Sequence, residues 1–396
     1  MKRFLTATAI TALTASAAFA QGEEIKIGVI LGFTGPLETL SPPMAGGAEI
    51  AMAEVTASGL LLGGATVTPV RGDSTCTDAA AATATAERLI TSDGIVAIMG
   101  AMCSGATGAI LSNVALPNGI AMISPSATSP GLSTVEDNGL FFRTAPSDAR
   151  QGQVMTQIIL DRGISEVAVS YTNNDYGKGL ADTFQAAFEA AGGTVTLSAS
   201  HEDGRADYSA EVGALAAAGG EALVVAGYVG EGGSGIVQGS LDTGAFDLFV
   251  FPDGMLSEEL VERFGSDIDG SFGQMPGSDS EGGPIYEEMA TAAGVDGASV
   301  YSKEAYDAAA LLMLAMQAAG SSSSGDLKDH VMAVANAPGE LILPGELGKA
   351  LQILADGGEI DYAGASAVEL IEPGEAAGVY REVEISGGAM NTVGFR

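Results

Sequence analysis

The chain has 396 residues, of which 50 are acidic and 16 are basic, and its formal net charge is −34. So negative a protein repels nucleic acids and anionic membranes at long range, which argues against a nucleic-acid partner and against membrane binding. The hydrophobic fraction of 46% distinguishes the chain from acidic disordered proteins, and its length favours two domains.

The first twenty residues are typical of a secretory signal peptide. Met1-Lys2-Arg3 is positively charged, an apolar and small-residue run follows, and Ala18-Phe19-Ala20 has the small-x-small pattern of a cleavage site. We expect cleavage after Ala20 and export to the periplasm. No later stretch approaches the roughly 20 consecutive apolar residues of a membrane span, so we predict no membrane insertion.

Short apolar runs then alternate with helical patterns. Predicted strands cover residues 25–31, 66–70, 95–99 and 121–123. Predicted helices cover residues 44–57, 78–90 and 105–116. Strands and helices that alternate in this way indicate βαβ units and a parallel sheet.

A second series of the same kind begins after Phe141-Phe142-Arg143-Thr144. Its predicted helices cover 149–161, 177–190, 209–218 and 235–241, and its predicted strands cover 167–171, 195–198, 222–228 and 248–251. The remaining chain is rich in helices, at 284–293, 299–319, 327–335 and 346–355, with short strands at 367–371 and 380–385. These late helices could return to cover the first sheet.

The two series predict an α/β fold of two doubly wound parallel-sheet lobes joined by a three-segment hinge. We expect the crossings near residues 143–146, 273–277 and 372–378. Lobe 1 would comprise residues 21–145 and 277–374, and lobe 2 would comprise residues 146–276 and 375–396. A ligand that touches both lobes would favour the closed form.

Ligands of an open parallel sheet bind beyond the carboxyl ends of its strands. Two polar segments follow predicted strands at this end: Cys103-Ser104-Gly105 comes after strand 95–99, and the stretch 124–130 comes after strand 121–123. Both segments offer hydroxyls and backbone N–H groups. They could hold an anion, or serve only as caps and turns. Asp253 ends another apolar run, where its carboxylate could neutralise an ammonium group or merely form a turn. Cys76 and Cys103 are the two cysteines, so they pair with each other or not at all.

Several motifs occur in order along most of the mature chain. They are Ile25-Lys26-Ile27-Gly28-Val29, Thr34-Gly35-Pro36, Cys103-Ser104, Ile123-Ser124-Pro125-Ser126-Ala127-Thr128, Phe142-Arg143-Thr144, Tyr176-Gly177-Lys178-Gly179-Leu180-Ala181 and Gly227-Tyr228. With these motifs the chain resembles the periplasmic solute-binding proteins of ATP-driven importers, in the branched-chain amino-acid (leucine/isoleucine/valine) binding family. The resemblance implies the type I periplasmic binding protein fold and a Cys76–Cys103 disulfide.

The resemblance also implies residue roles in the cleft between the lobes. The residues that would hold the α-carboxylate of an amino acid are Ser104, Ser126, Ala127 and Thr128. Asp253 would meet the α-ammonium group, and Tyr176 and Tyr228 would close over the ligand from lobe 2. Tyr301 would face the side-chain pocket.

The sequence departs from the family after Thr34-Gly35-Pro36, where relatives often have an aromatic residue. This chain has Leu37-Glu38-Thr39-Leu40 instead, and we assign Leu40 to that place. Together with Met102 and Tyr301, Leu40 favours an apolar ligand side chain.

Two features of the sequence bear on a different function. Gly230-Glu231-Gly232-Gly233-Ser234-Gly235 fits the G-x-G-x-x-G pattern of dinucleotide-binding enzymes, with Asp253 about twenty residues later. Exported proteins rarely meet NAD, which makes this a remote alternative. The two histidines give no catalytic arrangement, and the charged neighbours of His201 predict a surface loop.

We therefore expect a monomeric, non-enzymatic binding protein without cofactor or metal. It would capture a small amino acid, branched-chain or similarly apolar, and deliver it to an ABC transporter permease. A binding protein for an amide or another small carboxylate, and a sensor that presents its ligand to a receptor, remain alternatives.

Overall fold

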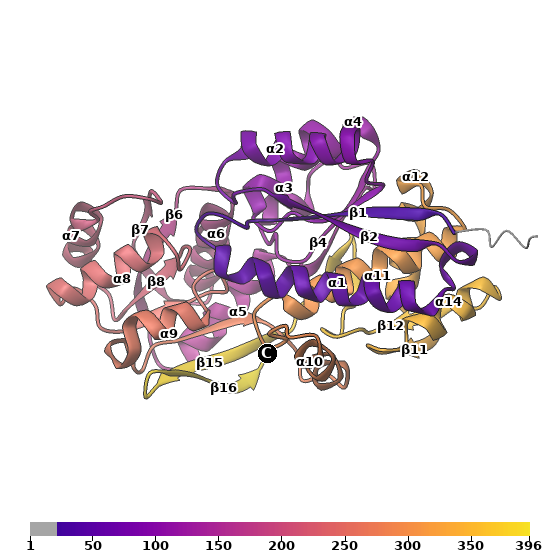
Figure 1. The fold of residues 1–396 in the computed structure, drawn as a ribbon. Coiled ribbons are helices and arrows are strands. Elements are labelled where there is room, and N and C mark those ends of the chain that lie inside the picture. The colour runs from indigo at the N-terminus through magenta and orange to yellow at the C-terminus, as the bar shows by residue number, and fades with distance from the viewer. Residues whose placement is uncertain (1–21) are drawn as a thin grey trace, which may run out of the picture.

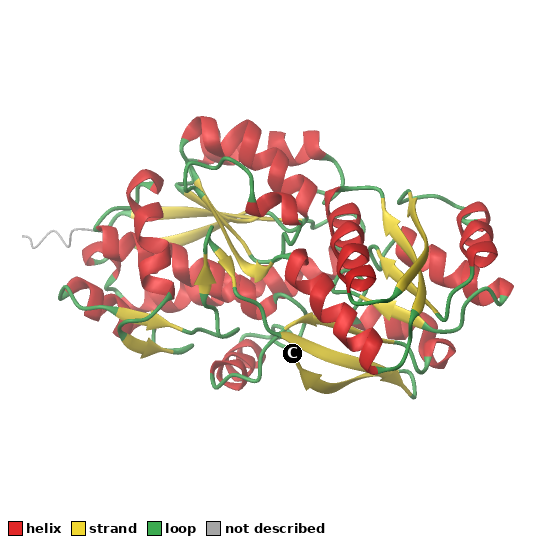
Figure 2. Cartoon of the chain, turned by 180° about the vertical axis from the view of Figure 1, so that it is seen from behind, coloured by secondary structure: helices red, strands yellow, loops and turns green. Residues whose placement is uncertain are grey.

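The computed structural model describes residues 22–396, so the predicted signal peptide and its cleavage site lie outside the described residues. The chain forms two α/β groups side by side, and the C-terminal strands lie close to the junction between them (Figure 1). Helices flank both sheets (Figure 2). The predicted α/β fold with two doubly wound sheets is confirmed.

The first sheet has the order β13-β14-β5-β4-β3-β1-β2 and is parallel except for the β13–β14 pair. Its strands are β1 (Glu24–Leu31), β2 (Thr66–Asp73), β3 (Ala97–Gly100), β4 (Ala121–Ser124), β5 (Phe141–Pro146), β13 (Leu370–Ile371) and β14 (Glu375–Ala376). The central strands read as continuous apolar runs because helices cover both faces of the sheet.

The helices on the first sheet come from two distant parts of the chain. They are α1 (Ser41–Ser58), α2 (Ala79–Arg88), α3 (Ser104–Ile110), α4 (Leu116–Asn118), α10 (Gly282–Ala292), α11 (Ser302–Ala319), α12 (Ser324–Leu327), α13 (Val331–Ala335) and α14 (Leu347–Ala355). The long helix α11 packs beside α1 and against β3, β4 and β5, and most of it is buried. The late helices thus return to the first sheet, as predicted. A small sheet of β11 (Glu340–Ile342) and β12 (Ile360–Tyr362) accompanies them.

The second sheet has the order β16-β15-β10-β9-β8-β6-β7, with β15 antiparallel to both of its neighbours. Its strands are β6 (Glu166–Thr172), β7 (Thr194–His201), β8 (Ala222–Ala226), β9 (Phe249–Phe251), β10 (Phe272–Pro276), β15 (Tyr380–Ser386) and β16 (Ala389–Phe395). Its helices are α5 (Asp148–Asp161), α6 (Asp175–Ala190), α7 (Ser209–Ala218), α8 (Gly232–Thr243) and α9 (Glu258–Phe264). None of the helices within residues 22–396 is both long and apolar enough to cross a membrane.

Three chain segments connect the two sheets: β5 to α5, β10 to α10, and β14 to β15. The second and third run together, since the backbone N–H of Gly277 donates to the carbonyl of Val379 at 3.0 Å. The short strand β14 pairs with β5, so Glu375 and Ala376 belong to the first sheet. We keep the exact lobe boundaries as a proposal.

Candidate ligand-binding site

In both sheets the order in which successive strands are added reverses at equivalent places, between β1 and β3 in the first and between β6 and β8 in the second. Such switch points leave a crevice beyond the carboxyl ends of the strands. The loops after β3 and β4 reach this crevice from the first lobe. The segments after β6, β8 and β9 reach it from the second lobe.

A partly enclosed cavity lies where these segments meet. Its atom-free volume is about 320 Å³, although little of that space is wide enough for a water molecule. The lining residues are Leu37, Leu40, Met102, Cys103, Ser104, Ser126, Tyr176, Tyr228, Asp253, Gly254 and Tyr301. Seven of the nine predicted ligand contacts are among them. Ala127 and Thr128 are buried but are not among the lining residues.

Asp253 follows β9 and is 3% exposed. Its Oδ1 accepts from Gln151 Nε2 at 2.8 Å and from the Tyr176 hydroxyl at 2.9 Å, and its Oδ2 accepts from the Tyr301 hydroxyl at 2.6 Å. Burial raises the pKa of Asp253, while these hydrogen bonds lower it. Since Tyr301 precedes α11, its bond to Asp253 joins the two lobes.

Two tyrosine rings form one wall of the cavity. Tyr176 and Tyr228 stack with centroids 5.3 Å apart and an interplanar angle of 9°. The side chain of Asn174 caps α6 by accepting from the N–H groups of Tyr176 and Gly177, which fixes the start of this helix. Residue 254 must be small, because a Cβ there would lie 2.8 Å from the Tyr176 hydroxyl.

Hydrogen bonds within the chain fix the hydroxyl-rich turn after β4. Ser126 donates to the carbonyl of Met102 at 2.9 Å, and the Ser104 hydroxyl accepts from the N–H of Ser129 at 3.1 Å. Beneath the turn, the buried guanidinium of Arg143 donates to the carbonyls of Ala127 and Ser129. The Thr128 hydroxyl is buried and has no hydrogen-bond partner within residues 22–396.

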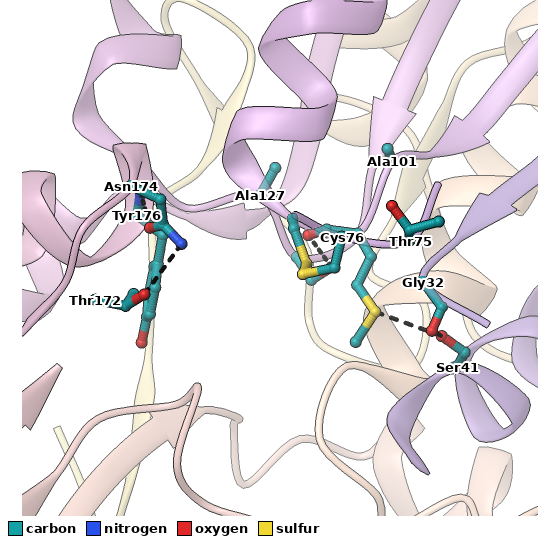
Figure 3. The surroundings of a disulfide bond; sticks show 12 residues. Gly32, Ser41, Thr75, Cys76, Ala101, Ala127, Thr172, Asn174 and Tyr176 are labelled. Carbon is teal, nitrogen blue, oxygen red and sulfur yellow. Dashed lines mark hydrogen bonds between the residues drawn. A yellow bond between two sulfur atoms is a disulfide. The ribbon is translucent and has the colours of Figure 1, made fainter. Parts of the chain in front are cut away.

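The cysteines are joined in a disulfide, Cys76–Cys103, with a Cα–Cα distance of 5.2 Å. It ties the loop after β2 to the start of α3. Figure 3 shows Cys76 between Gly32 and Ser41 on one side and Tyr176 and Asn174 on the other. The predicted pairing is confirmed, and the bridge lies next to the cavity through Cys103.

The sequence reasoning missed two polar residues near Asp253. Gln151, on α5, donates to Asp253, and Asp148 begins the same helix. Both are buried. Their only signal in the sequence is that they follow a predicted crossing segment, which carries no chemical information by itself. The ligand contacts predicted from the sequence also omit Leu37 and Gly254, although both line the cavity.

The surface loop predicted for residues 201–205 begins only after His201: Glu202, Gly204 and Arg205 are exposed and lie in a loop, but His201 itself is buried. His201 ends β7 and is 1% exposed, and its Nδ1 lies 2.9 Å from the Ser170 hydroxyl. The strand β7 continues to His201, beyond the apolar run that predicted it. Hydrophilic neighbours in the sequence therefore did not reveal its burial.

The glycines of the G-x-G-x-x-G pattern serve close packing. A Cβ at position 230 would lie 2.4 Å from the carbonyl oxygen of Pro36, and one at 235 would lie 2.3 Å from the ring of Tyr208. The N–H of Gly230 already donates to Pro36, and that of Gly232 donates to Asp203. Within residues 22–396, no group of three or more acidic, histidine or cysteine side chains could hold a metal ion.

Comparison with known proteins identifies the family to which this chain is related. A family model described as periplasmic binding protein matches residues 24–338. Members of this family are binding proteins and not enzymes, which confirms the non-enzymatic prediction and overturns the dinucleotide alternative.

Two relatives illustrate the sequence similarity. A Leu/Ile/Val-binding protein homologue of Brucella melitensis is 35% identical over 222 residues, which is 55% of this chain and 58% of that protein's length. The Leu/Ile/Val-binding protein BraC3 of Rhizobium johnstonii is 29% identical over 330 residues, 81% of this chain and 86% of the relative.

Solved structures share the fold. A leucine-binding protein LivK from Thermotoga maritima superposes with a TM-score of 0.79 at 22% identity, covering 94% of this chain and 98% of that one. A solute-binding protein from Rhodopseudomonas palustris, in complex with p-hydroxybenzoic acid, gives 0.76 at 18% identity, covering 94% and 97%. This chain belongs to the periplasmic binding protein family, as an extracytoplasmic solute-binding protein of an ABC transporter.

Proposed function

We propose that the protein works in the periplasm, where it captures a small amino acid, branched-chain or similarly apolar, in its interlobe cavity. It then delivers this ligand to the membrane permease of the transporter. The observation that carries the proposal is the buried carboxylate of Asp253 at a cavity that Leu37, Leu40 and Met102 also line. A carboxylate there attracts the ammonium group of a ligand, and the three apolar side chains suit an aliphatic ligand side chain.

The roles of the remaining predicted residues belong to this proposal. The groups that would bind the α-carboxylate belong to Ser104, Ser126, Ala127 and Thr128. Tyr176 and Tyr228 would cover the ligand from the second lobe. The cleft would have to widen before an amino acid enters, since little of the cavity is wide enough even for a water molecule.

A small carboxylate without an amino group is the second candidate. The stacked pair of Tyr176 and Tyr228 could face a planar ring, and the Rhodopseudomonas palustris structure contains p-hydroxybenzoic acid. A buried carboxylate disfavours such a ligand, because its own negative charge would approach Asp253 without a compensating cation.

The first prediction tests Asp253. We expect Asp253→Ala to weaken binding of leucine, isoleucine or valine by about 2–4 kcal/mol, because a buried ammonium group loses its charged partner. Isothermal titration calorimetry on the mature chain would measure this, with Asp247→Asn as the control for net charge. Asp247 is exposed and precedes β9 at the end opposite Asp253.

Undiminished affinity in Asp253→Ala would contradict the ammonium role. Tighter binding of 4-hydroxybenzoate than of any amino acid by the unaltered protein would replace the first candidate with the second.

A further inference from the structure

The protein itself already provides hydrogen-bond donors to both carboxylate oxygens of Asp253. Oδ1 accepts from Gln151 and Tyr176, which belong to the second lobe, whereas Oδ2 accepts from the hydroxyl of Tyr301 at 2.6 Å. Tyr301 directly precedes α11 of the first lobe and is 4% exposed. The two oxygens therefore take their side-chain donors from different lobes.

The candidate cavity beside this carboxylate has no room for an amino acid in the described conformation. Little of its atom-free volume of about 320 Å³ is wide enough even for a water molecule. Tyr301 lines this cavity and also lines a second cavity of about 720 Å³, which Pro276 and Gly277 of the second crossing segment border. Displacement of the Tyr301 ring towards the second cavity would enlarge the first.

The backbone of Tyr301 has a conformation that a bulky residue rarely adopts. Its φ of 65° and ψ of 3° lie in the left-handed region, and its side chain does not cap α11. Such a conformation persists only where surrounding contacts hold it, and it is concentrated at ligand clamps and switches. The hydrogen bond to Asp253 is one such contact, so breaking it would allow the backbone to relax.

We propose that Tyr301 is an internal competitor of the ligand: its hydroxyl occupies Oδ2 of Asp253 and keeps the lobes closed, and ligand binding requires this bond to break. An ammonium group bonds a carboxylate more strongly than a neutral hydroxyl does, so the ligand can displace Tyr301. The closed ligand-free form lowers the apparent affinity, because only molecules in which the bond is broken can take up ligand. The inference rests on the proposed function and adds a regulation of the same site.

Tyr301→Phe tests the inference, because it keeps the ring and removes only the hydroxyl. We expect the variant to bind leucine, isoleucine or valine more tightly by about threefold or more in calorimetry, since more of the ligand-free protein is competent to bind. Tyr286→Phe is the matched control: its buried hydroxyl bonds Ser302 within the first lobe, and its loss should leave the affinity unchanged. Equal or weaker binding by Tyr301→Phe would overturn the inference.

A kinetic measurement on the unaltered protein does not depend on how the variant folds. The chain has nine tyrosines and no tryptophan, so stopped-flow tyrosine fluorescence can follow binding. If the bond must break first, the observed rate should approach a limit as the leucine concentration rises, and this limit should be higher in Tyr301→Phe. Rates that rise in proportion to the leucine concentration, without a limit and equally in both proteins, would contradict the competition.

The outcomes separate this inference from the proposed function. If Asp253→Ala loses affinity and Tyr301→Phe gains none, Asp253 meets the ligand and only this inference fails. If neither the unaltered protein nor Tyr301→Phe binds leucine, isoleucine or valine, the proposed function fails and the inference fails with it. Binding by Tyr301→Phe alone would support both.

Discussion

The imidazole of His201 is neutral because His201, the last residue of β7, is buried. The ring is buried beside Ser170, and burial lowers the pKa of His201 to about 4, although the charge of Glu202 raises it slightly. An unfolded chain would protonate a histidine near pH 6.5. The unfolded state therefore binds more protons than the folded state between about pH 6.5 and 4, and His201 destabilises the fold as the pH falls through that range.

His201→Gln should remove this pH dependence. From pH 7 to 4.5, the unfolding free energy of the unaltered protein should fall relative to the variant by about 2–3 kcal/mol. Denaturant unfolding at several pH values would measure the difference. The pKa of Asp307 is raised to about 6 and that of Glu304 to about 7 by burial, which has the opposite effect, but both acids are present in each protein. Parallel pH profiles would show that His201 is not the cause.

Among the elements, β5 and β14 are joined by a buried ion pair that also supports the candidate site. Arg143 on β5 is 1% exposed, and its guanidinium pairs with Glu375 on β14. The same guanidinium holds the carbonyls of Ala127 and Ser129 in the turn after β4. One side chain thus connects two crossing segments to the hydroxyl-rich turn.

Arg143→Met should lower the unfolding free energy by about 3–5 kcal/mol, because it removes the cationic partner of Glu375 and the side-chain donor to two buried carbonyls. In a double-mutant cycle, Arg143→Met with Glu375→Gln should lose less than the sum of the two single changes. Chemical denaturation would measure all three variants. Lys178→Met is the control, since the Lys178–Asp182 pair has side chains 60% and 59% exposed and should contribute less than about 1 kcal/mol. Additive losses would show that Arg143 and Glu375 act separately.

For the whole molecule, three polar contacts join the two lobes. Tyr301 donates to Asp253, the N–H of Gly230 donates to Pro36 at 3.1 Å, and Thr39 donates to Glu259 at 3.2 Å. An open form would lose contacts of this kind, so a ligand that joins the same two surfaces would shift the population towards the closed form.

Tyr301→Phe should shift the ligand-free protein towards the open form, because it removes a hydrogen bond to a buried carboxylate. Small-angle X-ray scattering should give a larger radius of gyration than for the unaltered protein, and a saturating ligand should reduce the difference. Tyr286→Phe is the matched control: that hydroxyl is also buried, but it bonds Ser302 within the first lobe. An unchanged radius in Tyr301→Phe would mean that other contacts govern closure.

The sequence alone determined the two sheets, because strands covered on both faces are continuous apolar runs that stand out between helical patterns. It missed β5 and β10, because Arg143 and Gln274 interrupt their apolar runs, and it assigned both segments only to the crossings. It also missed β16, since that strand is largely exposed and its polar pattern differs little from a loop. Turn residues after the strands indicated the crevice, because the parallel topology brings all carboxyl ends to one edge.

Only the tertiary structure decided which polar groups are left without partners. Asp148, Gln151 and His201 stand among ordinary hydrophilic neighbours in the sequence, yet all three are buried, and residues at least 31 positions away bond to Gln151 and His201. Burial and hydrogen bonding depend on atoms that meet after folding, so local composition determined the strands and helices of this protein, and the contacts between its lobes decided the electrostatics of its cavity.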